Sequence, residues 1–262
     1  MQRTAAERED VFVAAISYDP VATLARFATE FGIAYDLLAD VGSVEMERLG
    51  MLNRTIADEV AAWGLVFAAR HDRVPFPGVF LLDEDGVVIE KKFDRSHRVR
   101  PSGSVLLADL TGEELAPAVS GIATGPGVGV TAWLDEATFF PGQRLYAHVR
   151  IEVLDGYHLY VPPLAEGYVP LRVQIDQDPT LTAEVTALPA GRPFRVEGLT
   201  EEFSVVEGIV DAKIPFYFSD EAAGDAALVI RIGYQACTDS VCLVPEELRI
   251  ELPIAYLPIP RP

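Results

Sequence analysis

Residues 234–254 read YQACTDSVCLVPEELRIELPI and contain both cysteines of the 262-residue chain, Cys237 and Cys242. Strand-like residues precede Cys237, and the strand-like run 248–254 follows Cys242 by a few positions. The four residues between the cysteines include Thr, Asp and Ser, which favour a tight connection. A disulfide joins Cα atoms about 4.4–6.8 Å apart. The pattern therefore predicts a connection between strands that brings the two sulfurs within disulfide reach.

The sequence upstream of this segment, from Val130 onward, has almost no helical periodicity. Strand-like runs recur instead, and turn residues and prolines separate them, as in a β-sandwich. The expected strands are 130–134, 145–153, 171–175, 183–187, 209–218, 227–234 and 248–254. The second half of the chain is therefore predicted to be an all-β sandwich.

The first half, to about Leu110, alternates between strand and helix patterns, which is typical of an α/β layer. Asp19 and Pro20 supply an N-cap and a first-turn proline for a helix, and Gly32 ends it. The expected elements are a strand at 11–17, a helix at 21–31, a strand at 35–39, a helix at 44–49, and a hairpin of 79–82 and 87–93 around the turn 83–86.

A stretch rich in glycine, which includes GIATGPGVG at 121–129, separates the two halves. Such a composition indicates a linker or a linker-like entry strand. We therefore expect a first domain at 1–110, a linker at 111–124 and a second domain at 125–257.

Composition excludes several classes of protein. The chain carries 21 Lys and Arg against 40 Asp and Glu, a net charge of −19, which disfavours nucleic acid as a partner. No apolar run approaches the roughly 20 residues of a membrane helix. The first ten residues, MQRTAAERED, lack the apolar region of a signal peptide. Two cysteines are too few for a disulfide framework or a four-cysteine zinc site. No metal and no cofactor is predicted.

The cysteine pair has two interpretations. A disulfide across so short a loop gains little stability on the chain-entropy model, so it is a poor structural staple and a better candidate for a bond that opens and closes. Alternatively, the cysteines are buried small hydrophobes or form a static disulfide. Asp239, between them, would oppose thiolate formation if it lay close to either sulfur.

The segment 234–254 closely resembles the cysteine segment of the amino-terminal, periplasmic domain of the thiol:disulfide interchange protein family DsbD. The likeness extends upstream through 140–142, 156–160, 167–170 and 203–208. The resemblance implies an immunoglobulin-like sandwich and a periplasmic location. It also implies that Cys237 and Cys242 are the redox pair, which accepts electrons from a transmembrane thiol relay and passes them to oxidised partner proteins. One departure is Tyr157, where the family often has Trp.

Other polar and aromatic residues of this half are interpreted as structural. We expect His158 to be a histidine bonded to a backbone carbonyl. Tyr157, Tyr160 and Tyr234 are expected to be core or cap residues. Of these, His158 and Tyr234 are candidates for structural support of the cysteine pair.

The first half resembles the later part of a peroxiredoxin of the alkyl hydroperoxide reductase/thiol-specific antioxidant (AhpC/TSA) kind. The matching residues are 14–40, 46–53 and 75–86. The resemblance implies a thioredoxin fold, in which Pro77 holds the position of a usually cis proline that supports the active site. The family's peroxidatic cysteine has no counterpart, because no cysteine precedes Cys237. Met1–Asp10 looks like the end of the helix that would carry it. We therefore expect an N-terminally incomplete redoxin domain that is inactive as a peroxidase.

The leading hypothesis is a two-domain bacterial redox protein that exchanges disulfides with thioredoxin-like proteins or a membrane thiol relay through Cys237 and Cys242. Cys237 is expected to face the partner, although the sequence does not rank the two sulfurs. One alternative is a non-enzymatic binding or adaptor module with a static disulfide. Another is a thiol peroxidase, if a catalytic cysteine lies upstream of this chain.

Overall fold

A computed structural model describes residues 11–93, 100–164, 167–195 and 202–258. The chain divides into two compact units, within residues 1–114 and 115–260. Met1–Asp10, expected to end a helix, lies outside the described residues. No helix in the described part of the chain is long and apolar enough to cross a membrane.

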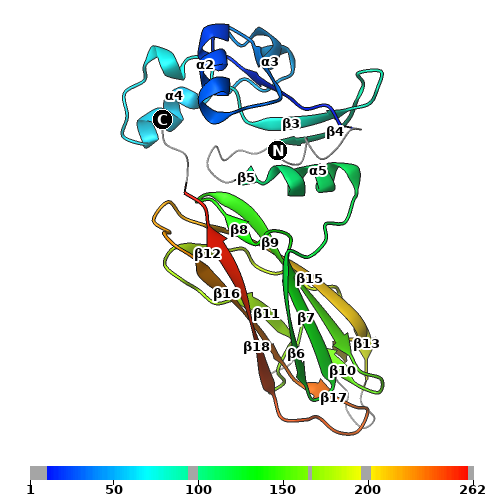
Figure 1. The fold of residues 1–262 in the computed structure, drawn as a ribbon. Coiled ribbons are helices and arrows are strands. Elements are labelled where there is room, and N and C mark those ends of the chain that lie inside the picture. The colour runs from blue at the N-terminus through cyan, green and yellow to red at the C-terminus, as the bar shows by residue number, and fades with distance from the viewer. Residues whose placement is uncertain (1–10, 94–99, 165–166, 196–201, 259–262) are drawn as a thin grey trace. The chain divides into compact units, whose positions relative to one another are not determined.

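The first unit opens with a strand–helix–strand motif (Figure 1). Strand β1 (Ala14–Ser17) pairs in parallel with β2 (Asp36–Ala39), and helix α2 (Val21–Phe31) connects them. The helix has the predicted bounds, although Pro20 rather than Asp19 is its N-cap. It ends at Gly32, whose φ of 60° is left-handed and suits glycine.

The rest of the unit holds the predicted hairpin, β3 (Gly78–Leu82) with β4 (Val88–Phe93), which pair antiparallel. Two helices were not predicted, α4 (Ile56–Ala62) and α5 (Gly103–Thr111). The remaining elements are α3 (Val44–Arg48), the 3₁₀ helix η1 (Ala69–His71) and β5 (Arg100–Pro101).

The expectation of a cis bond between Phe76 and Pro77 is wrong. Among the described residues, the cis peptide bond joins Pro162 and Pro163. The trans isomer is the intrinsically favoured one for a residue before proline. In this arrangement the Phe76 N–H donates to the Met51 carbonyl at 2.6 Å. The resemblance to a thioredoxin fold therefore loses this support.

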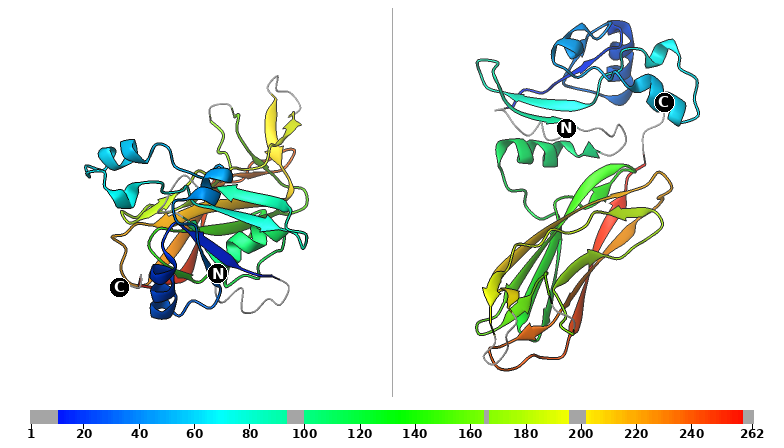
Figure 2. Two further views of the ribbon diagram at one scale, coloured as in Figure 1. Left: turned by 90° about the horizontal axis from the view of Figure 1, so that it is seen from above. Right: turned by 180° about the vertical axis from the view of Figure 1, so that it is seen from behind.

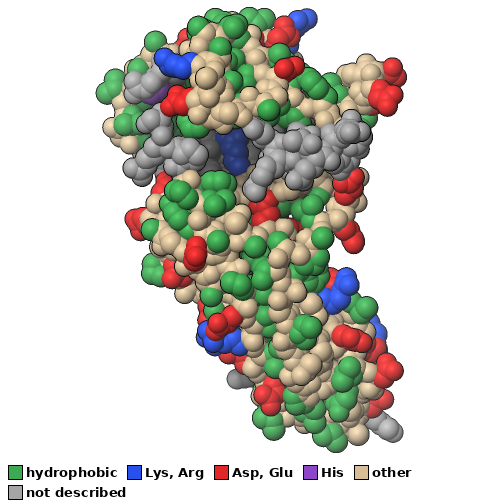
Figure 3. Space-filling view, viewed as in Figure 1, with side chains coloured by type: hydrophobic (Ala, Val, Ile, Leu, Met, Phe, Trp, Pro, Cys, Tyr) green, Lys and Arg blue, Asp and Glu red, His purple; other side chains and the backbone are tan. Residues whose placement is uncertain are grey.

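The core of the first unit is small. Its strands β1–β2 and β3–β4 form two separate two-stranded sheets, and such sheets bury little surface by themselves. Apolar side chains are visible over the surface of this unit (Figure 3). The exposed ones include Phe12, Val21, Val41, Val66, Val87 and Ile89, and the buried ones are Leu24, Met46, Met51, Val60, Val105, Leu106 and Ala108.

The second unit is a β-sandwich, as predicted. One of its sheets has the strand order β12-β15-β9-β7-β6, and the other has the order β11-β16-β18-β8. A third, smaller sheet has the order β13-β14-β10-β17. The strands are β6 (Val119–Gly125), β7 (Val128–Leu134), β8 (Thr138–Phe139), β9 (Gln143–Val153), β10 (His158–Tyr160), β11 (Arg172–Ile175), β12 (Leu181–Ala183), β13 (Arg192–Phe194), β14 (Phe203–Val206), β15 (Gly208–Phe218), β16 (Ala226–Tyr234), β17 (Ala236–Cys237) and β18 (Glu246–Tyr256).

Alternation of apolar and polar residues builds the core of this sandwich. On β9 the side chains of Leu145, Ala147, Val149, Ile151 and Val153 are all buried, and the intervening residues face outward. β15 and β16 repeat the pattern. Strand β6 lies mostly within the stretch predicted as a linker, yet it pairs with β7 along its length. Two glycines of β6, Gly121 and Gly125, obscure the alternation, so the sequence left open whether this stretch was a linker or an entry strand.

The small third sheet positions the cysteines. Its strands β10, β13 and β17 gather at one end of the sandwich (Figure 1 and Figure 2). Strand β10 pairs antiparallel with β14 on one side and with β17 on the other. Since β17 continues from β16, this sheet ties the end of a core strand to the segment that contains both cysteines.

Substitution of one core residue tests this architecture. Ile214 on β15 is fully buried, so Ile214→Ala is expected to lower the free energy of unfolding by about 2–5 kcal/mol through the cavity it leaves. The matched control Ile209→Ala, on the same strand but 65% exposed, should change it by less than about 0.5 kcal/mol. Denaturant unfolding is followed by the fluorescence of Trp133 in a Trp63→Phe background. Equal effects of the two substitutions would contradict the assignment of the core.

Candidate functional site

The two cysteines form a disulfide. Their sulfurs are 2.08 Å apart and their Cα atoms 4.0 Å apart. The two residues face each other across an isolated antiparallel bridge. Cys237 ends strand β17, and Cys242 follows a turn of four residues. The prediction that the cysteines lie beside neighbouring strands with bonded sulfurs is confirmed.

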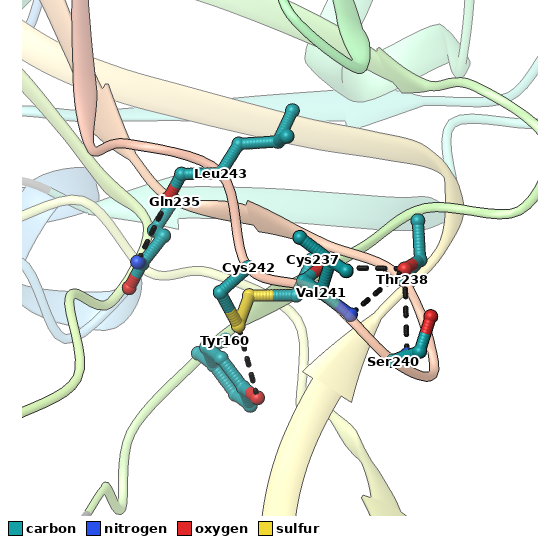
Figure 4. The surroundings of a disulfide bond; sticks show 8 residues. All are labelled: Tyr160, Gln235, Cys237, Thr238, Ser240, Val241, Cys242 and Leu243. Carbon is teal, nitrogen blue, oxygen red and sulfur yellow. Dashed lines mark hydrogen bonds between the residues drawn. A yellow bond between two sulfur atoms is a disulfide. The ribbon is translucent and has the colours of Figure 1, made fainter.

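Short polar side chains hold the turn between the cysteines (Figure 4). The Thr238 N–H donates to the Val241 carbonyl at 2.8 Å, and the Thr238 hydroxyl accepts from the N–H groups of Val241 and Ser240. Below the turn, the Leu243 N–H donates to the Ala236 carbonyl at 2.9 Å. The Gln235 side chain donates to the Leu243 carbonyl, also at 2.9 Å. These hydrogen bonds support the turn in addition to the disulfide.

The two cysteines differ in exposure. Cys237 is fully buried, because β17 lies against β10 and under aromatic side chains. Cys242 is exposed, as are its neighbour Val241 and, two residues on, Val244. An incoming thiolate can reach the exposed cysteine but not the buried one. The expectation that Cys237 faces the partner is therefore wrong, and Cys242 is the accessible residue.

A cluster of aromatic side chains encloses the buried cysteine. Cys237 packs with Tyr160, Phe203 and Val205, and the partly buried Leu164, Tyr168 and Phe194 surround them. The Tyr160 ring lies 5.4 Å from Phe203 and 5.2 Å from Tyr168. The cluster excludes water from the Cys237 side of the disulfide.

Tyr160 also contacts the accessible cysteine. Its hydroxyl oxygen lies 3.9 Å from the Cys242 sulfur (Figure 4). Burial raises the pKa of Tyr160, with a smaller contribution from Tyr168, so the hydroxyl keeps its proton as a potential donor. Tyr160 is the core residue that the sequence predicted, but its contact with a sulfur was missed. The signal was its position two residues after His158, on the same face of a strand.

His158 lies directly opposite Cys237 in the register of β10 and β17. Only 2% of the residue is exposed, and its ring centroid lies 4.3 Å from that of Phe194. Its Nε2 atom has no hydrogen-bond partner in the described part of the chain. The expected bond to a backbone carbonyl is therefore not formed by Nε2. Burial lowers the pKa of the imidazole below its usual value.

Three charged residues border His158. Arg192 donates two hydrogen bonds to the Glu207 carboxylate, the Nε bond at 3.0 Å. That contact lowers the pKa of Glu207 and raises the pKa of Arg192. The carboxylates of Glu207 and Asp239 oppose the effect of burial on His158, whereas Arg192 adds to it. Arg192 and Glu207 were not predicted as part of the site, because β13 and the β14–β15 connection approach it only in the folded chain.

Other candidate residues lie elsewhere. Tyr234 is buried in the main core of the sandwich, and its hydroxyl donates to the Pro126 carbonyl at 3.4 Å. Its support of the cysteine pair is limited to the strand that leads into β17. Tyr157 packs against the same core, and Pro77 belongs to the first unit. In the described ranges, no three His, Cys, Asp or Glu side chains group as metal ligands would.

Comparisons with known proteins concern the second unit. Residues 132–253 match the family described as "Thiol:disulfide interchange protein DsbD, N-terminal". No curated protein sequence matches the chain. Among solved structures, the chain is similar to the N-terminal periplasmic domain of ScsB from Proteus mirabilis, with 15% identity and a TM-score of 0.35 over 52% of this chain and 51% of that one. The match thus spans about half of that ScsB domain.

Two structures from Neisseria meningitidis are also similar to this chain. One is the reduced DsbD N-terminal domain, with 19% identity and a TM-score of 0.27 over 40% of this chain and 74% of that one. The other is the complex between the DsbD N-terminal and the PilB N-terminal domains, with 15% identity and a TM-score of 0.29 over 40% and 73%. The family match lies wholly within the second unit, so this unit is the part of the chain that is similar to the DsbD N-terminal domain.

Proposed function

We propose that the second unit exchanges disulfides with redox protein partners through Cys237 and Cys242. The observation that carries this proposal is the disulfide with one buried and one exposed cysteine at a sandwich end. In such a pair the exposed sulfur can be attacked by a partner, and the buried sulfur is the leaving group, which stays inside the protein. The match of residues 132–253 to the DsbD N-terminal family supports the same chemistry.

The exchange runs in two steps. A partner thiolate attacks the Cys242 sulfur, the Cys237–Cys242 bond breaks, and Cys237 leaves with the electron pair. The partner's second thiolate then attacks the partner's own sulfur in the mixed disulfide and releases Cys242. The partner is oxidised to a disulfide, and two electrons and two protons reduce the cysteine pair. The reverse sequence passes the same electrons to an oxidised partner.

The residues around the disulfide favour attack on Cys242 and departure of Cys237. The aromatic cluster shields the Cys237 side, so attack is directed to Cys242. The exposed Val241 and Val244 flank Cys242 and provide apolar contact area for a partner. Partners of the thioredoxin-like or membrane thiol relay class fit the proposal. The DsbD domain from Neisseria meningitidis forms a complex with a PilB domain, which supports a protein as the partner.

For the first unit we propose a thioredoxin-like fold that does not carry out thiol chemistry. The parallel β1–α2–β2 motif and the β3–β4 hairpin support this assignment. Both cysteines of the chain belong to the second unit, so the first unit supplies no thiolate as nucleophile. The trans peptide bond before Pro77 does not match the usually cis proline of the thioredoxin fold.

The reduction potential separates exchange from a static disulfide. A static disulfide would make the second unit an adaptor module, and its potential would lie below about −300 mV. We expect a more oxidising value, measured by equilibration with glutathione and dithiothreitol buffers. Because only five positions separate the cysteines, reduction should cost at most about 2 kcal/mol and lower the melting temperature by a few degrees. A potential below −300 mV, or unfolding on reduction, would support the adaptor.

Single cysteine variants test which sulfur reacts. Cys237→Ser leaves the exposed Cys242 and should form a mixed disulfide with glutathione disulfide rapidly. The matched variant Cys242→Ser leaves the buried Cys237 and should react more than about tenfold more slowly. Mass spectrometry of the quenched mixtures gives both rates. Faster reaction of Cys237 would contradict the assignment of Cys242 as the accessible residue.

A further inference from the structure

His158 Nε2 has no hydrogen-bond partner among the described residues of the oxidised protein. The residue is 2% exposed, so the nitrogen is shielded from bulk solvent. Leaving a buried polar atom unsatisfied typically costs about 1–3 kcal/mol. Neutral imidazole has one ring nitrogen that accepts a hydrogen bond, and an accepting Nε2 requires a donor. The disulfide has no S–H group, so Cys237 offers no donor in this redox state.

The register of the third sheet places a potential donor beside this nitrogen. His158 and Cys237 are directly opposed on β10 and β17. Side chains of opposed residues leave the sheet on the same face, with Cβ atoms about 4.5–5.5 Å apart. His158 and Tyr160 share that face, and their ring centroids are 5.5 Å apart. Reduction of the disulfide creates a thiol at Cys237, the residue directly opposite His158 on the neighbouring strand.

We propose that His158 is the general base that deprotonates Cys237 when the reduced pair is reoxidised. This inference rests on the proposed exchange function and assigns a further residue to it. A buried thiol ionises poorly, since burial disfavours its charged form. A buried but neutral imidazole can accept the proton locally, and the aromatic cluster keeps water from competing.

The step balances as follows. The Cys242 thiolate first attacks a partner disulfide, forms a mixed disulfide and releases one partner thiolate. His158 Nε2 then accepts the proton of the Cys237 thiol, and the resulting thiolate attacks the Cys242 sulfur. The Cys237–Cys242 bond forms, and the second partner thiolate leaves with the electron pair. The imidazolium then releases its proton to solvent, so the pair has lost two electrons and two protons.

The charged groups around His158 act in opposite directions on the pKa of its imidazole. Glu207 and Asp239 favour the imidazolium that forms during the step. Burial and Arg192 favour the neutral ring that precedes and follows it. Tyr160 stays protonated and points its hydroxyl toward Cys242 rather than competing for the proton. The opposing influences leave the imidazole neutral between turnovers and able to accept a proton.

The reaction of the reduced full chain with 5,5′-dithiobis(2-nitrobenzoate) resolves the step. The first thionitrobenzoate is released when Cys242 attacks, at a rate that depends on reagent concentration. The second is released when Cys237 resolves the mixed disulfide, at a rate that does not. His158→Gln should slow the second phase about 100-fold, the contribution typical of a general base, and leave the first phase unchanged. The control His148→Gln, on the outer face of β9, should change neither phase.

The pH profile distinguishes a base from a structural role. In the native chain, the second-phase rate should rise with pH and level off once the imidazole is neutral. In His158→Gln it should rise about tenfold per pH unit until the thiol itself ionises. An unchanged second phase with the native pH profile would overturn the proposal. Loss of the first phase in the native chain would instead contradict the proposed exchange function.

A measurement on the native protein guards against misfolding of the variant. In ¹⁵N NMR, the chemical shift of His158 Nε2 should change when the disulfide is reduced, because the Cys237 thiol then donates a hydrogen bond to this nitrogen. Equal Nε2 shifts in the oxidised and reduced proteins would also overturn the proposal. Both measurements use the full chain.

Discussion

The pairing of β10 with β17 is the contact on which the redox end of this protein depends. It extends over only two residue pairs, yet it adds the edge strand β17 to the third sheet and buries Cys237. Because β17 follows directly from β16, the long pairing of β16 with β18 fixes where this short strand begins. The small sheet around the disulfide is thereby held by a large core. The same register decides which side chain faces Cys237.

The chemistry follows from the unequal burial of two bonded cysteines. A symmetrical, fully buried disulfide would be inert, and a fully exposed one would react without selection between its sulfurs. Here the aromatic cluster covers one sulfur, and a polar turn with its own hydrogen bonds presents the other. The turn has hydrogen bonds of its own besides the disulfide. Burial also brings His158 into an environment in which an unpaired nitrogen is costly.

The two units differ in how completely they bury their apolar side chains. The sandwich buries two facing rows of apolar side chains, while the first unit exposes many of its own. The two small sheets of the first unit follow the hydrophobic pattern of the sequence, but its described residues do not join them into one continuous sheet. The proposed thioredoxin-like assignment is therefore supported by the order of the elements and not by their packing.

The sequence by itself determined the sandwich, the helix α2 and the closeness of the two cysteines. Long strands such as β9 and β15 alternate over eleven residues, and that period is a local property. Short strands such as β10, β13 and β14 carry no period of their own, so they were missed. The positions of Glu207 and Arg192, and the exposure of Cys242 instead of Cys237, depend on which segments meet across the fold. Tertiary structure alone decided those, because burial and register arise from contacts between residues far apart in the chain.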